Sequence, residues 1–208
     1  MLKNIIFDYM NVIADVDYKL LLSQLSLTDK IKALRLLVSL KTNKTMDQAF
    51  SDYQLGKLST EDICTIASSL YPKAATVLPK FMQLIPTCIR ENLNVITLIH
   101  QLQKEGFKII LISNSIPETQ YSIENSQISS FFDGFVLSNL VGLRKPDPKI
   151  YKLACETYGL KPEETLMIDD NSENLKGAKS VGLKTMICKD IKTLEDKLGN
   201  YFYSHYGK

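Results

Sequence analysis

The chain has 208 residues, of which 45% are hydrophobic and 23% are charged, and its formal net charge at pH 7 is +2. This size and composition are typical of a globular protein with a substantial core and one or two domains. The nearly balanced charge and the lack of a basic cluster in the sequence give no reason to expect nucleic acid or a membrane surface as a partner.

The amino-terminal segment, residues 1–7, is too short and too soon charged for a signal peptide. No apolar run approaches the ~20 residues that span a bilayer. The sequence contains four scattered cysteines, Cys64, Cys88, Cys155 and Cys188, and two histidines. Without a C-x-x-C spacing they do not predict a zinc site, so we expect reduced thiols and a cytoplasmic location.

Five short apolar runs predict the strands of a buried parallel sheet. They lie at residues 4–8, 108–112, 134–137, 165–168 and 184–188. Periodic segments at 93–105, 149–158 and 173–181 predict helices, and each is followed by a glycine that can adopt the left-handed conformation of a helix end. The alternation predicts an α/β fold with a doubly wound, parallel, Rossmann-like sheet.

About 100 residues without a strand signal separate the first two predicted strands. Helical periodicity appears there at residues 20–27, 29–40, 46–55 and 59–70. Since a crossover needs only about a dozen residues, we predict a helical cap inserted at residues 16–90, with residues 1–15 and 91–208 forming the α/β core. The aromatic-rich end, residues 200–206, is expected to pack on the core.

Polar residues follow the predicted strands. Asp8 ends the first, Ser113 the second and the pair Asp169–Asp170 the fourth, while Lys145 lies on a loop after the third. Because ligands bind at the carboxyl ends of the strands in an open α/β sheet, we expect these residues to converge on one crevice. A charge at the end of a buried strand is costly unless it is paired, which favours a functional role for Asp8 and Lys145.

The segments that carry these residues are F-D-Y-M-N-V-I-A-D at 7–15, L-I-S-N-S at 111–115, G-L-R-K-P-D-P-K-I-Y at 142–151 and I-D-D-N-S-E-N-L-K-G-A at 168–178. In this order they resemble the motifs of the haloacid-dehalogenase-like hydrolase superfamily, with a helical cap after the first motif. The resemblance covers essentially the whole chain. It extends to a branch with F-D-x-G-N-V-type first motifs, which includes a bacterial α-D-glucose-1-phosphate phosphatase.

This resemblance implies a magnesium-dependent phosphomonoesterase that acts on small phosphorylated metabolites, with sugar phosphates among the possible substrates. Asp8 would attack phosphorus and form an aspartyl-phosphate, which water then hydrolyses. Ser113 would hold phosphate oxygens, and Lys145 would offset the charge repulsion between Asp8 and the phosphate. Asn114 would either contact the substrate or hold a loop, and Ser113 alone would also suit a turn.

The resemblance also implies a magnesium site. Its ligands would be the Asp8 carboxylate, the backbone carbonyl of Met10 and Asp170, with Asp169 behind them near Lys145. Magnesium suits a few protein oxygens together with substrate oxygens.

Met10 stands where most phosphatases of the superfamily have a second aspartate, which serves as the acid-base group. Such help is worth ~10²–10⁴ in rate, so the chain is expected to favour easily departing groups or to recruit another proton donor. Two alternatives stay open: a phosphate-binding protein with little turnover, and a metal-independent dehalogenase, which Asp169–Asp170 disfavours. Glu173 and Asn174 are expected to begin a helix rather than act in catalysis.

Overall fold

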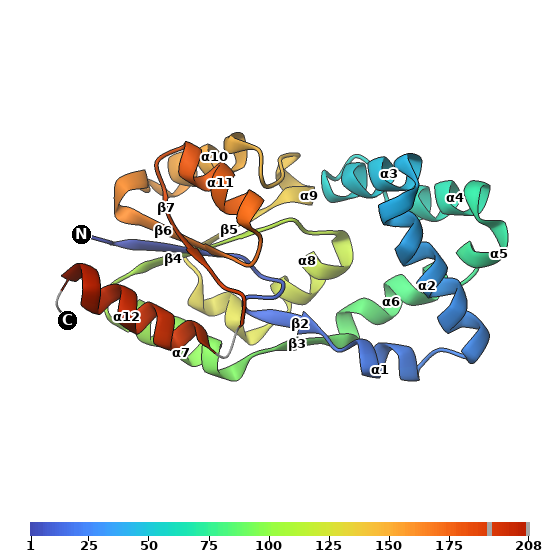
Figure 1. Ribbon diagram of the computed structural model, residues 1–208, viewed down its shortest axis with the longest axis horizontal. Coiled ribbons are helices and arrows are strands. Elements are labelled where there is room, and N and C mark those ends of the chain that lie inside the picture. The colour runs from blue at the N-terminus through green and yellow to red at the C-terminus, as the bar shows by residue number, and fades with distance from the viewer. Residues whose placement is uncertain (191–192, 207–208) are drawn as a thin grey trace.

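The structure is a computed structural model that describes residues 1–190 and 193–206, with the side chains of 195 and 202–206 outside the described set. A five-stranded sheet has the order β5-β4-β1-β6-β7, and all its neighbouring strands are parallel (Figure 1). Its strands are β1 (Asn4–Phe7), β4 (Lys108–Ser113), β5 (Gly134–Leu137), β6 (Thr165–Asp169) and β7 (Lys184–Ile187). The five predicted strands are confirmed, each end within one residue.

Helices cover both faces of this sheet because successive strand side chains point to opposite faces. Ile5 and Phe7 pack in one cluster with α7 (Leu93–Lys104), α8 (Pro117–Glu124) and α12 (Leu194–Tyr206). Ile6 packs in another with α10 (Pro148–Tyr158) and α11 (Ser172–Ser180). Burial on both faces explains why each strand reads as a continuous apolar run, and it confirms the doubly wound α/β fold.

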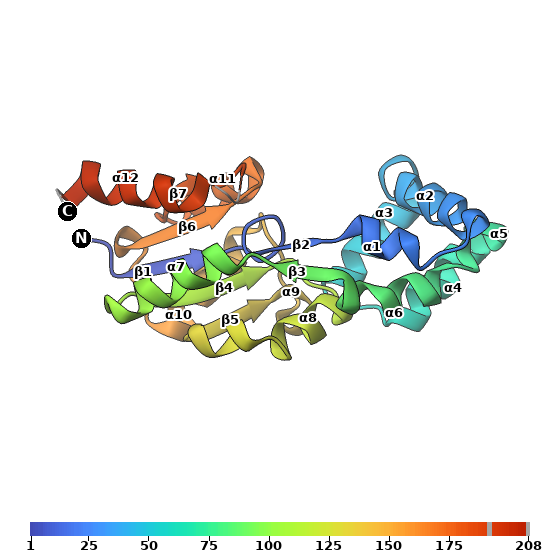
Figure 2. The ribbon, with the colours of Figure 1, turned by 90° about the horizontal axis from the view of Figure 1, so that it is seen from below.

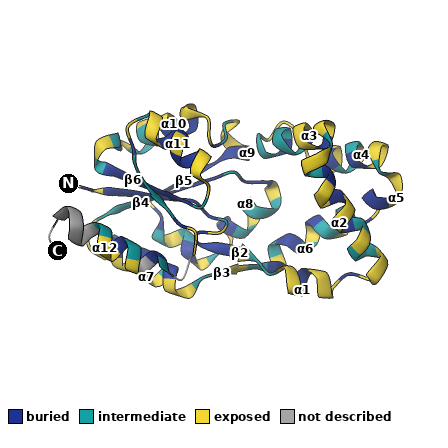
Figure 3. Cartoon of the chain, in the orientation of Figure 1, coloured by how far each residue is buried: buried dark blue, intermediate teal, exposed yellow. Residues whose placement is uncertain are grey.

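The polypeptide between β1 and α7 is mainly helical and lies to one side of the sheet (Figures 1 and 2). It contains α1 (Tyr18–Ser23), α2 (Leu27–Thr42), α3 (Lys44–Gln54), α4 (Thr60–Leu70), α5 (Pro72–Ala75) and α6 (Leu78–Cys88). These helices share an apolar cluster of their own. Their inner faces are buried while the outer faces of α1 and α2 are exposed (Figure 3).

The helices predicted in this segment are present, with one shift. A helix was expected at 20–27, but α1 ends at Ser23, because the Ser26 side chain accepts from the Asp29 amide and starts α2 instead. The start of α4 is the predicted one, since Ser59 and Asp62 form a reciprocal capping box. The sequence did not predict α6, in which Pro86 lies inside the helix.

Two three-residue strands enter and leave this helical segment, which corrects the expectation of no strand between β1 and β4. They are β2 (Ala14–Val16) and β3 (Ile89–Glu91), which pair antiparallel with Val16 opposite Ile89. Strands of three residues are too short for a detectable alternation.

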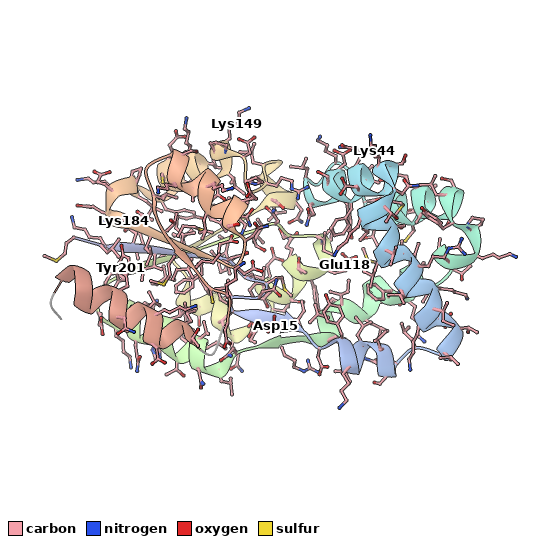
Figure 4. All side chains as sticks on the ribbon, viewed as in Figure 1. Asp15, Lys44, Glu118, Lys149, Lys184 and Tyr201 are labelled. Carbon is pink, nitrogen blue, oxygen red and sulfur yellow. The ribbon has the colours of Figure 1, made fainter. Side chains whose placement is uncertain are left out.

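A second set of contacts joins the helical segment to the sheet domain at Glu118 of α8, which lies at their junction (Figure 4). The Tyr53 hydroxyl donates to Glu118 Oε2 at 2.6 Å, and the Thr60 hydroxyl donates to Oε1 at 3.0 Å. Nearby, Ser138 donates to the Gln54 carbonyl at 2.6 Å. The helical segment is therefore held to the core on two sides, by the β2–β3 ribbon and by this cluster.

The end of the chain forms α12, in which Leu194 and Leu198 are buried and Tyr201 packs against the same cluster as α7. The expected packing of the aromatic tail is thus seen at Tyr201, while the side chains of 202–206 lie outside the described set. The four cysteines are free thiols. None of the described helices is both long and apolar enough to cross a membrane.

Candidate active site

Three of the predicted site residues meet at the carboxyl edge of the sheet. Asp8 directly follows β1, Ser113 is the last residue of β4 and Asp169 is the last residue of β6. Strand β1 lies between β4 and β6 and is parallel to both, so these ends are neighbours. The strand order reverses here, which is the place where open α/β sheets bind ligands.

Lys145 brings a buried positive charge to this edge. Its side chain is 1% exposed, and its Nζ lies 2.7 Å from Asp8 Oδ1 and 2.7 Å from Asp169 Oδ2. A buried ammonium is costly unless it is paired. The two carboxylates therefore fix Lys145 between the ends of β1 and β6.

The backbone around Lys145 is held by Asn114 and by a close helix contact. Asn114 Oδ1 accepts from the Lys145 amide at 2.8 Å, and its Nδ2 donates to the Lys145 carbonyl at 2.9 Å. On the other side, a Cβ at Gly177 of α11 would lie 2.2 Å from the Pro146 carbonyl oxygen. Both ends of the Asn114 amide are engaged by the loop, which favours the loop-holding role of the two expected for this residue.

Asp169 is fully buried and its two oxygens are surrounded by donors. Besides Lys145, the Asn171 amide donates to Oδ1 at 2.8 Å. The Asn174 side chain donates to Oδ1 at 3.0 Å and lies 3.1 Å from Oδ2. Such saturation holds the carboxylate in one orientation and leaves it little capacity for further ligands.

Asp8, Asp169 and Asp170 offer carboxylate oxygens that lie within 4.8 Å of one another. Asp170 is partly exposed, and its Oδ2 accepts from Asn11 Nδ2 at 3.0 Å. Oxygen-only donor sets of this kind suit hard divalent cations, and Mg²⁺ commonly takes one or two carboxylates plus substrate oxygens. The residues present therefore fit a magnesium ion held mainly by Asp8 and Asp170; the carbonyl of Met10 stays a predicted ligand.

Asp8 is oriented through one of its two oxygens. Oδ1 accepts from the Tyr9 amide at 2.7 Å and contacts Lys145, whereas Oδ2 has no donor among the described residues. Burial raises the pKa of Asp8 to about 7; Lys145 lowers it in part, and the neighbouring Asp169 charge raises it. A bound cation would oppose this rise by favouring the ionised form.

Ser113 is 2% exposed at the end of β4, and Asp8 directly follows the neighbouring strand β1. Its hydroxyl makes no hydrogen bond to another described residue, and it is not fully shielded from solvent, because no fully buried side-chain oxygen of the described residues lacks a partner. The next side chain that could cap a turn, Ser115, is already bonded to Asn139. A free hydroxyl at this edge suits the predicted contact with phosphate better than a turn cap.

Met10 lies on a tight turn after Asp8. The Tyr9 carbonyl accepts from the Ile13 and Ala14 amides at 2.8 and 3.0 Å. Asn11 has φ of 60°, a left-handed conformation that asparagine tolerates. Met10 itself is half-buried and faces an apolar cavity between the sheet domain and the helices. A thioether there can neither donate nor accept a proton in catalysis.

Several positioning residues were not predicted. Asn174 was expected only to begin a helix; it does lie in α11, but its side chain is buried against Asp169. Asn11 and Lys189 hold Asp170, the latter by donating to its carbonyl at 2.9 Å. The available signal was the position of Asn174, five residues after Asp169 and in the first turn of the helix that follows the strand. Glu173 lies in the first turn of α11, as expected, and its exposed side chain pairs with Lys176.

Curated relatives share parts of this chain. A glyceraldehyde 3-phosphate phosphatase of Pyrococcus furiosus is 34% identical over 122 residues, which is 58% of this chain and 51% of that protein. The pyrophosphatase PpaX of Bacillus mycoides is 32% identical over 99 residues, 47% of this chain and 46% of that one. The chain thus spans about half the length of these relatives.

Solved structures match over nearly the whole fold. The enzyme bt-2542 of Bacteroides thetaiotaomicron superposes with a TM-score of 0.76 at 18% identity, covering 95% of this chain and 98% of that one. L-2-haloacid dehalogenase of Xanthobacter autotrophicus gives 0.62 at 18% identity, covering 96% and 83%. At such identities these likenesses concern the fold alone.

The family itself is shown by sequence. A family model described as haloacid dehalogenase-like hydrolase matches residues 3–182, which include β1, the helical segment and every residue of the carboxylate and lysine cluster. The chain therefore belongs to the haloacid dehalogenase-like hydrolases.

Proposed function

We propose that this protein is a magnesium-dependent phosphomonoesterase that acts on small phosphorylated molecules through an aspartyl-phosphate on Asp8. The arrangement around Asp8 carries the proposal. Its Oδ1 is held by Tyr9 and Lys145, its Oδ2 is free of donors among the described residues, and Asp169 and Asp170 lie beside it. A held carboxylate with one open oxygen next to a cation site is what phosphoryl transfer to aspartate requires.

In the first step Asp8 Oδ2 attacks phosphorus, an Asp8–phosphorus bond forms, and the bond from phosphorus to the leaving oxygen breaks. The leaving group departs with the electron pair. In the second step water attacks the same phosphorus, and Asp8 is released as a carboxylate together with inorganic phosphate. Asp8 must be ionised to attack, and a cation held by Asp8 and Asp170 would favour the ionised form against the rise of the Asp8 pKa caused by burial.

The other residues of the site would position the phosphoryl group and balance its negative charge. Lys145 would face the transferring group and balance its negative charge, and the Ser113 hydroxyl would donate to a phosphate oxygen. Asp169 would keep Lys145 in place, supported by Asn174. Magnesium, held by Asp8, Asp170 and the Met10 carbonyl, would neutralise charge on the phosphoryl oxygens. Residues 16–90 would serve as the cap over this site, and residues 1–15 and 91–208 as the catalytic core.

The comparisons support this proposal without naming the substrate. Both curated relatives carry names of enzymes that act on phosphorylated compounds. The Bacteroides enzyme of the same fold was crystallised with magnesium and inorganic phosphate. Sugar phosphates as substrates and a cytoplasmic location both stay predictions from the sequence.

Release of inorganic phosphate from acetyl phosphate and p-nitrophenyl phosphate tests the proposal. Activity should require Mg²⁺, disappear with EDTA and disappear in Asp8→Asn, whose side chain is nearly isosteric but cannot attack phosphorus. Beryllium fluoride with Mg²⁺, which imitates a phosphoryl group on Asp8, should raise the melting temperature of the wild type. Turnover by Asp8→Asn equal to that of the wild type would remove Asp8 from the mechanism.

Two alternatives make different predictions. If the protein were instead a metal-independent dehalogenase, it would release halide from 2-haloacids in the presence of EDTA; dehalogenase is the activity in the name of the Xanthobacter structure. The closely placed carboxylates Asp169 and Asp170 would repel a departing halide, which disfavours it. A phosphate-binding protein with little turnover would bind phosphorylated ligands, but wild-type turnover would not exceed that of Asp8→Asn.

A further inference from the structure

An apolar cavity of about 270 Å³ lies between the inserted helices and the sheet domain. Of the described residues that line it, none is charged, and most are aliphatic, aromatic or methionine side chains, including Leu36, Leu40, Phe50, Val77, Phe81 and Met82. Its few polar side chains are Tyr18, Gln54, Asn114 and Thr119. The cavity is thus an apolar space with few hydrogen-bonding groups.

One end of this cavity lies at the catalytic loops. Met10, which lines it, follows Asp8 by two residues, and Asn114, which also lines it, is bonded to the backbone of Lys145. The Lys145 ammonium in turn contacts Asp8. The opposite wall is made by α2 and α6, through residues such as Leu36 and Phe81. Met10 and Asn114 therefore bring this end of the cavity next to the residues that hold Asp8 and Lys145.

We propose that the substrate is a phosphate of an apolar phenol or of an apolar carboxylic acid, and that this cavity holds its apolar part; the inference rests on the phosphatase function proposed above. Burying apolar area is favourable by about 25 cal/mol per Å². Sugar hydroxyls would lose hydrogen bonds to water here and find few replacements, which makes a sugar phosphate a poor occupant.

Met10 links the cavity to the choice of leaving group. A carboxylate at this half-buried position would face the apolar lining and be poorly solvated, whereas a thioether packs well there. Without an acid at residue 10, the best substrates are those whose leaving oxygen is stable as an anion. Phenolates and carboxylates meet this need: the phosphorus–oxygen bond breaks, and the anion leaves with the electron pair as the Asp8–phosphorus bond forms.

The volume limits the size of the apolar part. An apolar cavity of about 150 Å³ accepts benzene, so a cavity of about 270 Å³ has room for a group somewhat larger than one ring. A fused bicyclic ring or a medium-length acyl chain fits this size, and a long lipid chain exceeds it.

The first test compares 1-naphthyl phosphate with phenyl phosphate, whose leaving groups have similar acidity, and with glucose 1-phosphate. The wild type should prefer naphthyl over phenyl in kcat/KM by about tenfold, from the area of the extra ring, and should use glucose 1-phosphate least. Equal kcat/KM for naphthyl and phenyl phosphate, or a preference for glucose 1-phosphate, would overturn the inference.

Filling the cavity should abolish the naphthyl preference. Ala33 is buried on α2 and lines the cavity, so Ala33→Phe occupies part of it. Leu34→Phe, on the exposed side of the same helix, is the matched control and should keep the wild-type ratio. If Ala33→Phe does not fold, Leu40→Phe, at a partly buried lining position, replaces it. A folded cavity variant with the wild-type naphthyl-to-phenyl ratio would contradict the proposal.

A binding measurement separates failure of this inference from failure of the phosphatase function. Calorimetry measures the binding of 1-naphthyl phosphate, phenyl phosphate and inorganic phosphate to Asp8→Asn in the presence of Mg²⁺. If the naphthyl ester binds most tightly, the apolar site is supported. This holds even if the wild type hydrolyses none of the esters, a result that would contradict only the phosphatase proposal. Hydrolysis of acetyl phosphate by the wild type, with equal binding of the two esters, would sink only the apolar-substrate inference.

Discussion

Asn174 donates its side-chain amide to both carboxylate oxygens of Asp169, with distances of 3.0 and 3.1 Å. The Tyr151 hydroxyl fixes Asn174 in turn by donating to its carbonyl at 2.7 Å. Asp169 holds Lys145, and Lys145 holds Asp8, the proposed nucleophile. The orientation of Asp8 therefore depends on Asn174, although Asn174 does not contact it.

Replacing Asn174 by alanine should therefore destabilise the protein and slow the reaction together. Hydrogen bonds to a charged group are worth about 1.5–3 kcal/mol, and the melting temperature should fall accordingly. Glu173→Ala, at the adjacent exposed position, is the matched control and should melt like the wild type. Thermal melting and the Mg²⁺ dependence of phosphate release are the measurements. Equal melting temperatures and activities in the two variants would show that the Asn174–Asp169 hydrogen bonds contribute to neither stability nor activity.

The two neighbouring acids should respond differently to removal. Asp170→Ala should raise the half-saturating Mg²⁺ concentration at least tenfold and change the melting temperature in EDTA little, because Asp170 is partly exposed. Asp169→Ala should instead lower stability, since breaking a buried ion pair costs about 3–5 kcal/mol. Titrations of activity against Mg²⁺, with melting in EDTA, decide between them. A larger loss of Mg²⁺ affinity in Asp169→Ala would reverse the assignment.

Burial of Asp8 predicts an unusual dependence of stability on pH without metal. Its pKa is about 7 in the folded protein against a usual 3.8, so between these values the folded state holds more protons than the unfolded state. The free energy of unfolding therefore falls as pH rises through this window, by up to about 1.4 kcal/mol per pH unit, and the contribution is lost above pH 7.

Asp8→Asn cannot ionise and lacks this dependence, so in EDTA the difference in melting temperature between Asp8→Asn and the wild type should shift in favour of the variant as pH rises from 5 to about 7. Other carboxylates, such as Asp29, are common to both proteins and cancel in the difference. Mg²⁺ should reduce this pH-dependent change in the melting-temperature difference, because it stabilises the ionised form of Asp8. A difference in melting temperature that does not change with pH would contradict the raised pKa.

Met10→Asp places a carboxyl group two residues after Asp8. It tests the hypothesis that the protein lacks only the general acid at this position. It should raise kcat/KM for alkyl phosphates, whose leaving oxygen needs a proton, and do less for acyl or aryl phosphates. The gain is bounded by the ~10²–10⁴ typical of general acid catalysis. Met10→Asn, similar in size without the acid, is the control. A folded Met10→Asp protein that binds Mg²⁺ but shows no gain selective for alkyl phosphates would point to a proton donor elsewhere.

The sheet and its polar edge could be predicted because both depend on local patterns. Each buried strand is a short apolar run, and a charged residue at its end, such as Asp8 or Asp169, stands out in the sequence. Parallel pairing of the strands then places these ends together.

What could not be predicted depends on contacts between distant residues. Asn174 and Glu118 look like ordinary residues in the first turns of α11 and α8, and only the tertiary packing turns them toward Asp169 and Tyr53. Helix α6 was missed because Pro86 lies within it, and it persists because its apolar face packs on the other helices. The cavity arises between α2, α6 and Met10, which no single stretch of sequence describes.

The β2–β3 ribbon brings the two ends of the helical segment together. Val16 and Ile89 are paired across it, so the points where the chain leaves and rejoins the sheet domain are adjacent, although 72 residues lie between them. Joining them by a short turn such as Asn-Gly would turn the ribbon into an ordinary hairpin. Since the sheet's own apolar clusters draw no buried residue from α1–α6, we expect the shortened chain to keep its core and to expose the Asp8 edge directly to solvent. Replacing the helical segment at this ribbon is therefore expected to change which molecules reach Asp8 while Lys145 and Asp169 keep their places.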